Sequence, residues 1–356
     1  MTTIQELAER TGVSVATVSR ALNGSSEVSD STRERILALA RELDYTPSAA
    51  ARTLQSRRSH VVGVILETGA GHPDLMHPFF QQVLVGLKHG AGERGYDLLL
   101  FATDEPGNGF GGTHSYLRRA GHHGVDGVVV MGYEPGDPEM QKLVASGLPC
   151  ITIDADPGEP HCGYVMSENR EGANKAVRHL HGLGHERIAT IAGPARTSPG
   201  AARLEGYRDE MRRLGLDVRD EWVAEGDFYD ETGYRATRQL LELAEPPTAV
   251  FAASDLMAAG ALRAASELGI RVPDQLAVVG FDDIDVAGLI QPSLTTVRQE
   301  MHDIGEAAAE GLSQMIDDPD AEPVRRIVPT RLVVRSSCGA QRAPRERTLA
   351  TDKEVR

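Results

Sequence analysis

From Val61 onwards, short apolar runs alternate with longer stretches of helical periodicity, and this alternation constrains the fold more than any other feature. The first series has runs at Val61–Leu66, Tyr96–Phe101, Val125–Met131 and Pro149–Ile153, which are typical of parallel strands buried on both faces. The second series has strands near 187–191, 222–225, 249–252 and 276–280, with helices near 169–183, 201–214, 230–243 and 255–268. Two series of similar size predict two lobes, each built on a doubly wound parallel sheet, with a cleft between them.

Polar residues follow several of these strands, where the ligands of parallel sheets bind. Asp154, Ser254 and Asp282 each come directly after an apolar run, and Arg203 lies near the start of a helix. Carboxylates together with a forked guanidinium suit a ligand with several hydroxyl groups. Two further aspartates, Asp255 and Asp283, are interpreted as helix caps.

The N-terminal sixty residues follow a different pattern. A helix is predicted from about Thr3 to Arg10, followed by a turn at Gly12 and a second helix that Ser14 caps. In that second helix, Val18 and Leu22 share one side, and Ala16, Ser19 and Arg20 share the other. Two helices joined by a short turn form a helix-turn-helix, whose second helix enters the DNA major groove. The alternative is an ordinary pair of packed helices.

A third helix is predicted to end near Tyr45, because Pro47 disfavours helical geometry at Thr46. The following stretch, Ser48–Gln55, contains good helix formers but spans only two turns. A helix of that length is unstable alone in water, so we expect this segment to order only against a partner.

Composition excludes several classes of protein. The chain has 356 residues and 40% hydrophobic residues, which predicts a globular protein of two or three domains. No run approaches a membrane span, and Glu6 and Glu9 stand where a signal peptide would be basic, so we expect a cytoplasmic protein. The net charge of −15 arises outside the first sixty residues, which are close to neutral. The three cysteines are interpreted as buried thiols.

No catalytic, cofactor or metal motif is apparent. The glycine-rich stretch at 108–112 lacks the Gly-Lys-Ser/Thr of a phosphate-binding loop, and there is no G-x-S-x-G nucleophile elbow. Six histidines occur between His72 and His123, but without a metal-binding spacing. We therefore predict no enzyme activity, no cofactor and no metal site.

Three stretches together resemble one family. Thr3–Ala8, Val13–Gly24 and Leu43–Leu54 are similar to the headpiece and hinge helix of the LacI/GalR family of bacterial repressors. The resemblance implies base contacts from Val15, Ala16 and Arg20, of which Arg20 is able to contact guanine through both arms. It also implies that Leu54 wedges into the minor groove beside Ala51. The DNA-binding set that follows is Ser14, Val15, Ala16, Thr17, Ser19, Arg20, Asn23, Ser48, Ala51, Arg52 and Leu54.

The resemblance extends over roughly residues 2–336 and implies a periplasmic-binding-protein-like core. The expected domains are a helix-turn-helix headpiece (1–46), a hinge helix and linker (47–60), a core (61–336) and a disordered tail (337–356). The expected first lobe comprises about 61–158 and 295–327, and the second about 162–290 and 330–336. The chain would cross between lobes near 156–163, 290–294 and 328–331.

The family's effector contacts match Asp154, Arg203 and Asp282, while Phe228 stands where an aromatic ring stacks on a sugar. Pro78, Phe79 and Phe80 resemble an apolar patch at the start of the first core helix, and Phe79 or Phe80 could instead be core. Glu168–Asn169 replaces the more usual aspartate–asparagine, and Ser254 stands where asparagine is common. The expected effector set is Pro78, Phe79, Phe80, Asp154, Arg203, Phe228, Ser254 and Asp282.

These features together predict a transcriptional repressor. It would bind a palindromic, double-stranded operator as a homodimer and respond allosterically to a small sugar-like effector. A regulator that responds to a purine or another small molecule is the alternative within the same fold. A transport-type sugar-binding protein or an α/β enzyme would leave the N-terminal motifs unexplained.

Overall fold

The computed structural model describes residues 3–22, 25–45, 58–66, 74–102, 115–132 and 136–340. The chain divides into two compact units, Met1–His60 and Val61–Arg356. The base-contact candidate Asn23 and the hinge candidates Ser48, Ala51, Arg52 and Leu54 lie outside the described residues. No helix in the described ranges is long and apolar enough to cross a membrane.

The N-terminal unit contains three helices, α1 (Ile4–Thr11), α2 (Val15–Leu22) and α3 (Asp30–Glu42). Leu7, Val18 and Ile36, one from each helix, are fully buried and form the centre of its core. Gly12 follows α1 with a left-handed φ of 68°, which glycine adopts without strain, and α2 begins three residues later. The predicted helix-turn-helix is therefore confirmed.

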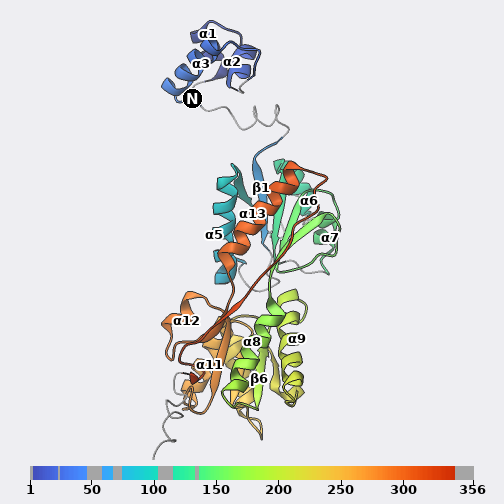
Figure 1. The fold of residues 1–356 in the computed structure, drawn as a ribbon, viewed down its shortest axis with the longest axis vertical. Coiled ribbons are helices and arrows are strands. Elements are labelled where there is room, and N and C mark those ends of the chain that lie inside the picture. Colours follow the sequence, from blue (N-terminus) through green and yellow to red (C-terminus); the bar gives the residue numbers. More distant parts are fainter. Residues whose placement is uncertain are drawn as a thin grey trace, which may run out of the picture. The chain divides into compact units, whose positions relative to one another are not determined.

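The first lobe of the larger unit has a six-stranded parallel sheet in the order β11-β5-β4-β3-β1-β2. Its strands are β1 (Val61–Leu66), β2 (Asp97–Leu100), β3 (Gly127–Met131), β4 (Cys150–Ile153), β5 (Cys162–Ser167) and β11 (Arg325–Val328). One face packs against α5 (Pro78–Glu93) and α13 (Met301–Asp317), and the other against α6 (Tyr116–His123) and α7 (Pro138–Val144) (Figure 1). A short 3-10 turn, η1 (Asp74–Met76), precedes α5.

The second lobe has its own six-stranded sheet in the order β12-β10-β9-β8-β6-β7, in which only β12 is antiparallel to its neighbour among the described strands. Its strands are β6 (Ile188–Ala192), β7 (Val223–Glu225), β8 (Ala249–Ala252), β9 (Ala277–Asp282), β10 (Thr295–Arg298) and β12 (Arg331–Val333). Its helices are α8 (Asn169–Gly182) and α9 (Ser198–Arg213) on one face, α10 (Asp230–Leu241) and α11 (Asp255–Glu267) on the other, and the short η2 (Asp220–Trp222) and α12 (Asp285–Leu289). The predicted two-lobed α/β core is confirmed.

Two of the three expected crossings are misplaced. β5 pairs with β4 in the first lobe, so the chain leaves that lobe after Ser167 and not near 156–163. β10 pairs with β9 in the second lobe, so the return comes between Arg298 and Met301 and not near 290–294. Both strands provide a partner for an otherwise exposed sheet edge, which favours each lobe keeping the strand that completes its sheet. The third crossing lies between β11 and β12, as predicted.

The lobes therefore comprise 61–167 with 301–328, and 169–298 with 331–340. The predicted tail also begins too early, because Ser337 and Cys338 are buried in the second lobe. Ser337 donates its hydroxyl to Val278 O (2.6 Å) and accepts from Thr295 N (2.9 Å). The rest of the expected tail, from residue 341, lies outside the described residues. Cys150, Cys162 and Cys338 are free and buried thiols, as predicted.

Candidate effector and DNA-binding sites

The strand ends of the two lobes bring three of the predicted effector residues into one buried network. Asp154 follows β4 in the first lobe, whereas Arg203 lies in α9 and Asp282 ends β9 in the second. The side chains of Arg203 and Asp282 are 4% and 2% exposed, and Asp154 is also buried. Because buried charges are costly unless they are paired, their convergence marks a candidate site.

Arg203 is the centre of this network. Its Nε donates to Asn169 Oδ1 (2.8 Å), and its Nη1 donates to the carbonyl of Ala253 (2.6 Å) and lies 3.5 Å from Asp282 Oδ1. Its guanidinium stacks 3.8 Å from the centre of the Phe281 ring. Burial lowers the pKa of Arg203 although Asp282 and Asp154 oppose that shift. The arginine is thus held by a carboxylate, an amide, a carbonyl and an aromatic face.

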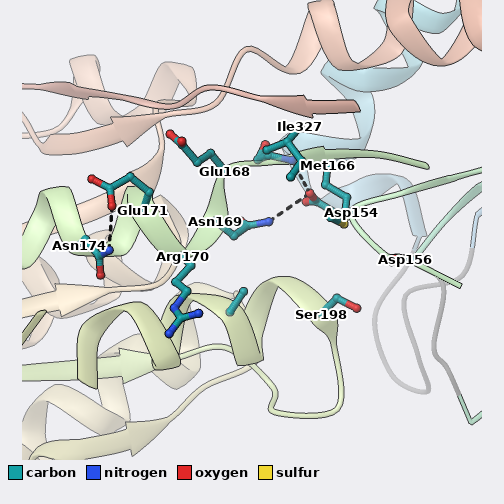
Figure 2. Close-up of a pocket in the computed structure, with 12 residues that line it drawn as sticks. Asp154, Asp156, Met166, Glu168, Asn169, Arg170, Glu171, Asn174, Ser198 and Ile327 are labelled. Carbon is teal, nitrogen blue, oxygen red and sulfur yellow. Dashed lines mark hydrogen bonds between the residues drawn. The ribbon is translucent and has the colours of Figure 1, made fainter. Parts of the chain in front are cut away.

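Asn169 connects Arg203 to the first lobe. It is the first residue of α8, and its Nδ2 donates to Asp154 Oδ1 (3.2 Å), as Figure 2 shows. The same oxygen accepts from the backbone of Ser167 (3.0 Å). Burial raises the pKa of Asp154, while Arg203 and these two hydrogen bonds act in the opposite direction. The path from Asp154 through Asn169 to Arg203 therefore joins both lobes.

Asp282 retains unused hydrogen-bonding capacity. Its Oδ1 accepts from Gln299 Nε2 (2.7 Å), whereas its Oδ2 and the Oε1 of Gln299 are buried without a partner among the described residues. Burial raises the pKa of Asp282 from 3.8 to about 6, against the attraction of Arg203. Unpaired buried acceptors are rare in folded proteins, and they are available to a ligand that donates hydroxyl protons.

The backbone at this site is strained. Asp154, Phe228, Asp282 and Asp283 have φ values of 58°, 74°, 121° and 61°. Non-glycine residues adopt such values at a cost of roughly 1–3 kcal/mol each, and they concentrate at functional sites. Asp154, Phe228 and Asp282 are predicted effector positions, and Asp283 directly follows Asp282, which supports a ligand site at the strand ends.

Aromatic rings lie next to the charged network. The Phe228 ring packs over Gly193, where a Cβ atom would approach the ring to 2.3 Å, and its centre lies 5.7 Å from the Arg203 guanidinium. His77 of the first lobe makes edge contacts with Phe80, Phe228 and Tyr229 at centroid distances of 6.2, 6.5 and 5.5 Å. Burial, together with Arg203, lowers the pKa of His77 to about 4, so this ring is neutral at physiological pH.

The structure also places Ser254, Asp255, Asp283 and the predicted apolar residues at the start of α5. Ser254 caps α11 by accepting from Met257 N (3.1 Å), and it donates to Phe228 O (2.8 Å), so its hydroxyl holds the backbone of Phe228. Asp255 and Asp283 are not helix caps, in contrast to the expectation from the sequence, because Ser254 and Ile284 occupy the N-cap positions of α11 and α12. Asp255 accepts from Ile284 N (2.9 Å) and from the Thr296 hydroxyl (2.5 Å).

Asp283 forms ion pairs with Arg298 and Arg335. Pro78 is the first residue of α5, and Phe79 is buried in the first-lobe core. Of the three residues expected to form an apolar patch, Phe80 is the one in ring contact with His77.

A pocket of about 460 Å³ opens beside the network (Figure 2). Asp154 and Asn169 contribute to its wall, whereas Arg203, Phe228 and Asp282 do not line it. The remaining wall is formed by Asp156, Met166, Ser167, Glu168, Arg170, Glu171, Asn174, Ser198, Ala202 and Ile327. Asp154 and Asn169 thus connect an open pocket to the buried charges behind it.

Three residues of the site lie outside the expected effector set: Asn169, which was named above only as part of the Glu168–Asn169 departure from the family pattern, Gln299 and His77. Asn169 and Gln299 follow β5 and β10, two strands that the sequence pattern does not predict, so neither residue is recognisable from the sequence as a strand-end position. His77 caps α5 by accepting from Phe79 N (3.3 Å). A histidine directly before Pro78 at the start of a helix was the available signal.

In the N-terminal unit, the exposed side of α2 carries the predicted base-contact residues. Ser14, Val15, Ala16 and Arg20 are exposed, and Thr17 and Ser19 are half-buried. Ser14 caps the helix by accepting from Thr17 N (3.1 Å), as expected. Arg20 pairs with Glu27 across 3.2 Å, and their side chains are 56% and 67% exposed. The opposite side of α2 is buried through Val18 and Ala21, so these exposed residues are available to a partner.

A helix-turn-helix unit joined to a two-lobed core with a candidate ligand site at its strand ends defines a DNA-binding transcriptional regulator. Models of the bacterial regulatory proteins of the lacI family and of the periplasmic binding protein-like domain match residues 3–48 and 177–338, respectively. The HTH-type transcriptional regulator CelR of Thermobifida fusca is 38% identical over 337 residues, which cover 94% of this chain and 98% of that protein. The chain belongs to the LacI family of bacterial transcriptional regulators.

Solved structures of regulators from this family are similar over the same extent. The transcriptional regulator CelR-cellobiose complex aligns with a TM-score of 0.71 and 34% identity, covering 95% of this chain and 100% of that chain. The lac repressor dimer bound to operator and the anti-inducer ONPF aligns with a TM-score of 0.79 and 28% identity, covering 95% and 99%.

Proposed function

We propose that this regulator is a repressor controlled by a small neutral sugar that binds at the Asp154–Arg203–Asp282 network. The observation that carries the proposal is the buried Oδ2 of Asp282, which has no partner among the described residues although it lies beside Arg203, whose Nε and Nη1 donate to other groups. A sugar hydroxyl donates to that oxygen, and the Phe228 ring covers an apolar sugar face. The relative whose structure holds cellobiose supports a sugar as the ligand class.

Regulation follows from the connection between the lobes. Asp154 belongs to the first lobe, and Asn169 and Arg203 belong to the second, so a ligand that competes for these groups favours one arrangement of the lobes. Such a ligand changes operator affinity only through its differential affinity for the two arrangements, typically by 5–150-fold. The direction of the change distinguishes an inducer from a corepressor.

The DNA partner is proposed to be a palindromic operator bound by a homodimer in the cytoplasm, at the nucleoid. The lac repressor structure, a dimer on its operator, supports this assembly. Val15, Ala16 and Arg20 would contact base edges, while Ser14, Thr17, Ser19, Asn23, Ser48 and Arg52 would contact the operator around them. Leu54, beside Ala51, would wedge into the minor groove at the centre of the operator.

A purine is the second candidate effector, because His77, Phe80, Phe228 and Tyr229 form an aromatic group able to stack on a planar base. Calorimetry with neutral sugars and with nucleobases, on wild type and on Asp282→Asn and Arg203→Ala, separates the two. A sugar that all three proteins bind equally well would place the effector elsewhere. A nucleobase bound in place of any sugar would select the purine.

A further inference from the structure

Two helices of the first lobe bring two histidines and a glutamate together, away from the effector site. His89 lies on α5, and His302 and Glu306 lie four residues apart on α13, which places them on one helix face. One ligand atom from each residue lies within 4.8 Å of the others. His89 Nδ1 is 2.6 Å from Glu306 Oε1, and His302 Nδ1 is 3.7 Å from the same oxygen.

Glycines hold these two helices unusually close at this point. A Cβ atom on Gly86 would lie 2.1 Å from the carbonyl oxygen of His302, and one on Gly305 would lie 2.1 Å from that of Val83. Gly90 faces Ala309 and Glu306 in the same way, at 2.9 and 3.2 Å. The backbones that carry the three side chains are therefore in direct contact, and the cluster stands on rigid elements, as a metal site requires.

The ligand types and spacing suit a divalent transition metal. Zn²⁺ binds imidazole nitrogen and carboxylate oxygen at about 2.0–2.2 Å, which places tetrahedral ligands about 3.3 Å apart. The two histidine–glutamate separations of 2.6 and 3.7 Å bracket that value, and all three ligand atoms lie within 4.8 Å of one another. Two imidazoles with one carboxylate favour Zn²⁺, Ni²⁺ or Cu²⁺ over Mg²⁺ and Ca²⁺.

A fourth residue, Glu93, would orient the metal-bound His89 from the side of its other ring nitrogen. His89 Nε2 lies 3.7 Å from Glu93 Oε1, one turn along α5. When Nδ1 of a histidine binds a metal, a carboxylate at the other nitrogen orients the ring and raises its basicity. Arg94 lies 3.8 Å from Glu93, but its Nη1 donates to the carbonyl of Gly90 (2.8 Å), so it is held against its own helix.

We propose that His89, His302 and Glu306 form a Zn²⁺-binding site that fastens α5 to α13. The sequence motifs gave no indication of it, because the ligands come from two helices more than 200 residues apart. The side chains are 58%, 47% and 38% exposed, so the site is open to a metal from solvent. It would stabilise the first lobe without contact to the effector network.

The test is isothermal calorimetry of the full, untagged chain with ZnCl₂, together with thermal unfolding with and without Zn²⁺. One Zn²⁺ per chain is expected at this site, with a rise in the unfolding midpoint of the core. His89→Ala, His302→Ala and Glu306→Gln should each weaken binding at least tenfold, because each removes one of three ligands. Co²⁺ in place of Zn²⁺ should show the visible absorption of a tetrahedral complex.

His122→Ala is the matched control, because it removes another exposed histidine of the first lobe, on α6. It should leave Zn²⁺ affinity unchanged. Unfolding midpoints without metal establish that each variant is folded, which is expected for exposed side chains. No Zn²⁺ binding by wild type, or equal binding by wild type and all three ligand variants, would overturn the proposal.

Discussion

Arg203→Met removes the cation at the centre of the buried network while retaining much of the side-chain volume. The change deletes the hydrogen bonds to Asn169 and Ala253 and leaves Asp282 without its charge partner. Removal of one partner from a buried ion pair costs about 3–5 kcal/mol, because the other charge stays buried and unpaired. The core unit, Val61–Arg356, has about 300 residues, and at about 2.1 cal/mol/K of unfolding entropy per residue each kcal/mol lowers its unfolding midpoint by roughly 1.5–2 °C. We therefore expect a decrease of roughly 5–10 °C.

Scanning calorimetry of the full chain at pH 7 measures this decrease in the core transition. Arg212→Met is the control, since Arg212 lies on the same helix, is 64% exposed and pairs with Asp209 at 3.5 Å. A surface pair of that kind contributes less than about 1 kcal/mol. If Arg203→Met is no more destabilising than Arg212→Met, Arg203 does not hold the network together and the description of the site is wrong.

Three further predictions concern single side chains. Arg20→Ala should weaken operator binding by about 1–3 kcal/mol and random-sequence binding much less, as measured by fluorescence anisotropy, and equal losses would exclude base reading. Glu27→Gln should strengthen operator binding by up to about fivefold, because it frees Arg20 from an exposed pair worth less than about 1 kcal/mol; unchanged affinity would count against that release. In wild type the folded state holds the Asp282 proton more tightly than the unfolded state, so the stability contribution is present below pH 4 and is lost as pH rises through about 6. At about 1.4 kcal/mol per pKa unit, the loss of folding free energy is at most about 3 kcal/mol. Asp282→Asn should reduce the difference in stability between pH 4 and pH 7, as measured by urea unfolding. An unaltered difference would assign the pH dependence of stability to other groups.

The strongest sequence signals were those that a single segment carries by itself. β1, β3 and β8 are continuous apolar runs, and the helix-turn-helix was visible because its buried positions recur at helical spacing. In contrast, β5 is Cys-Gly-Tyr-Val-Met-Ser and β10 is Thr-Thr-Val-Arg, which lack such a run. Their strand state depends on pairing with a neighbouring strand, which local sequence does not encode.

These two missed strands also explain the missed site residues. Asp154 and Asp282 were predicted because each follows a recognised strand, whereas Asn169 and Gln299 follow β5 and β10. The contact of His77 with Phe228 and Tyr229 joins two lobes, so it depends on how the lobes meet and not on any motif. Phe79 and Phe80 are adjacent in sequence, and only the packing of α5 decides which of them enters the core.

We expect one ligand at the strand-end network to change operator affinity. A thermal-shift panel of neutral sugars and nucleobases selects the ligand, and anisotropy then measures the operator Kd of the full chain with and without it. The operator Kd should change by about 5–150-fold, and Arg203→Met should remove that change. Ligand affinity should change by an equal factor when operator is present, because binding coupling is reciprocal. An operator Kd that the ligand leaves unchanged, although calorimetry shows the ligand bound at this site, would refute effector control through this network.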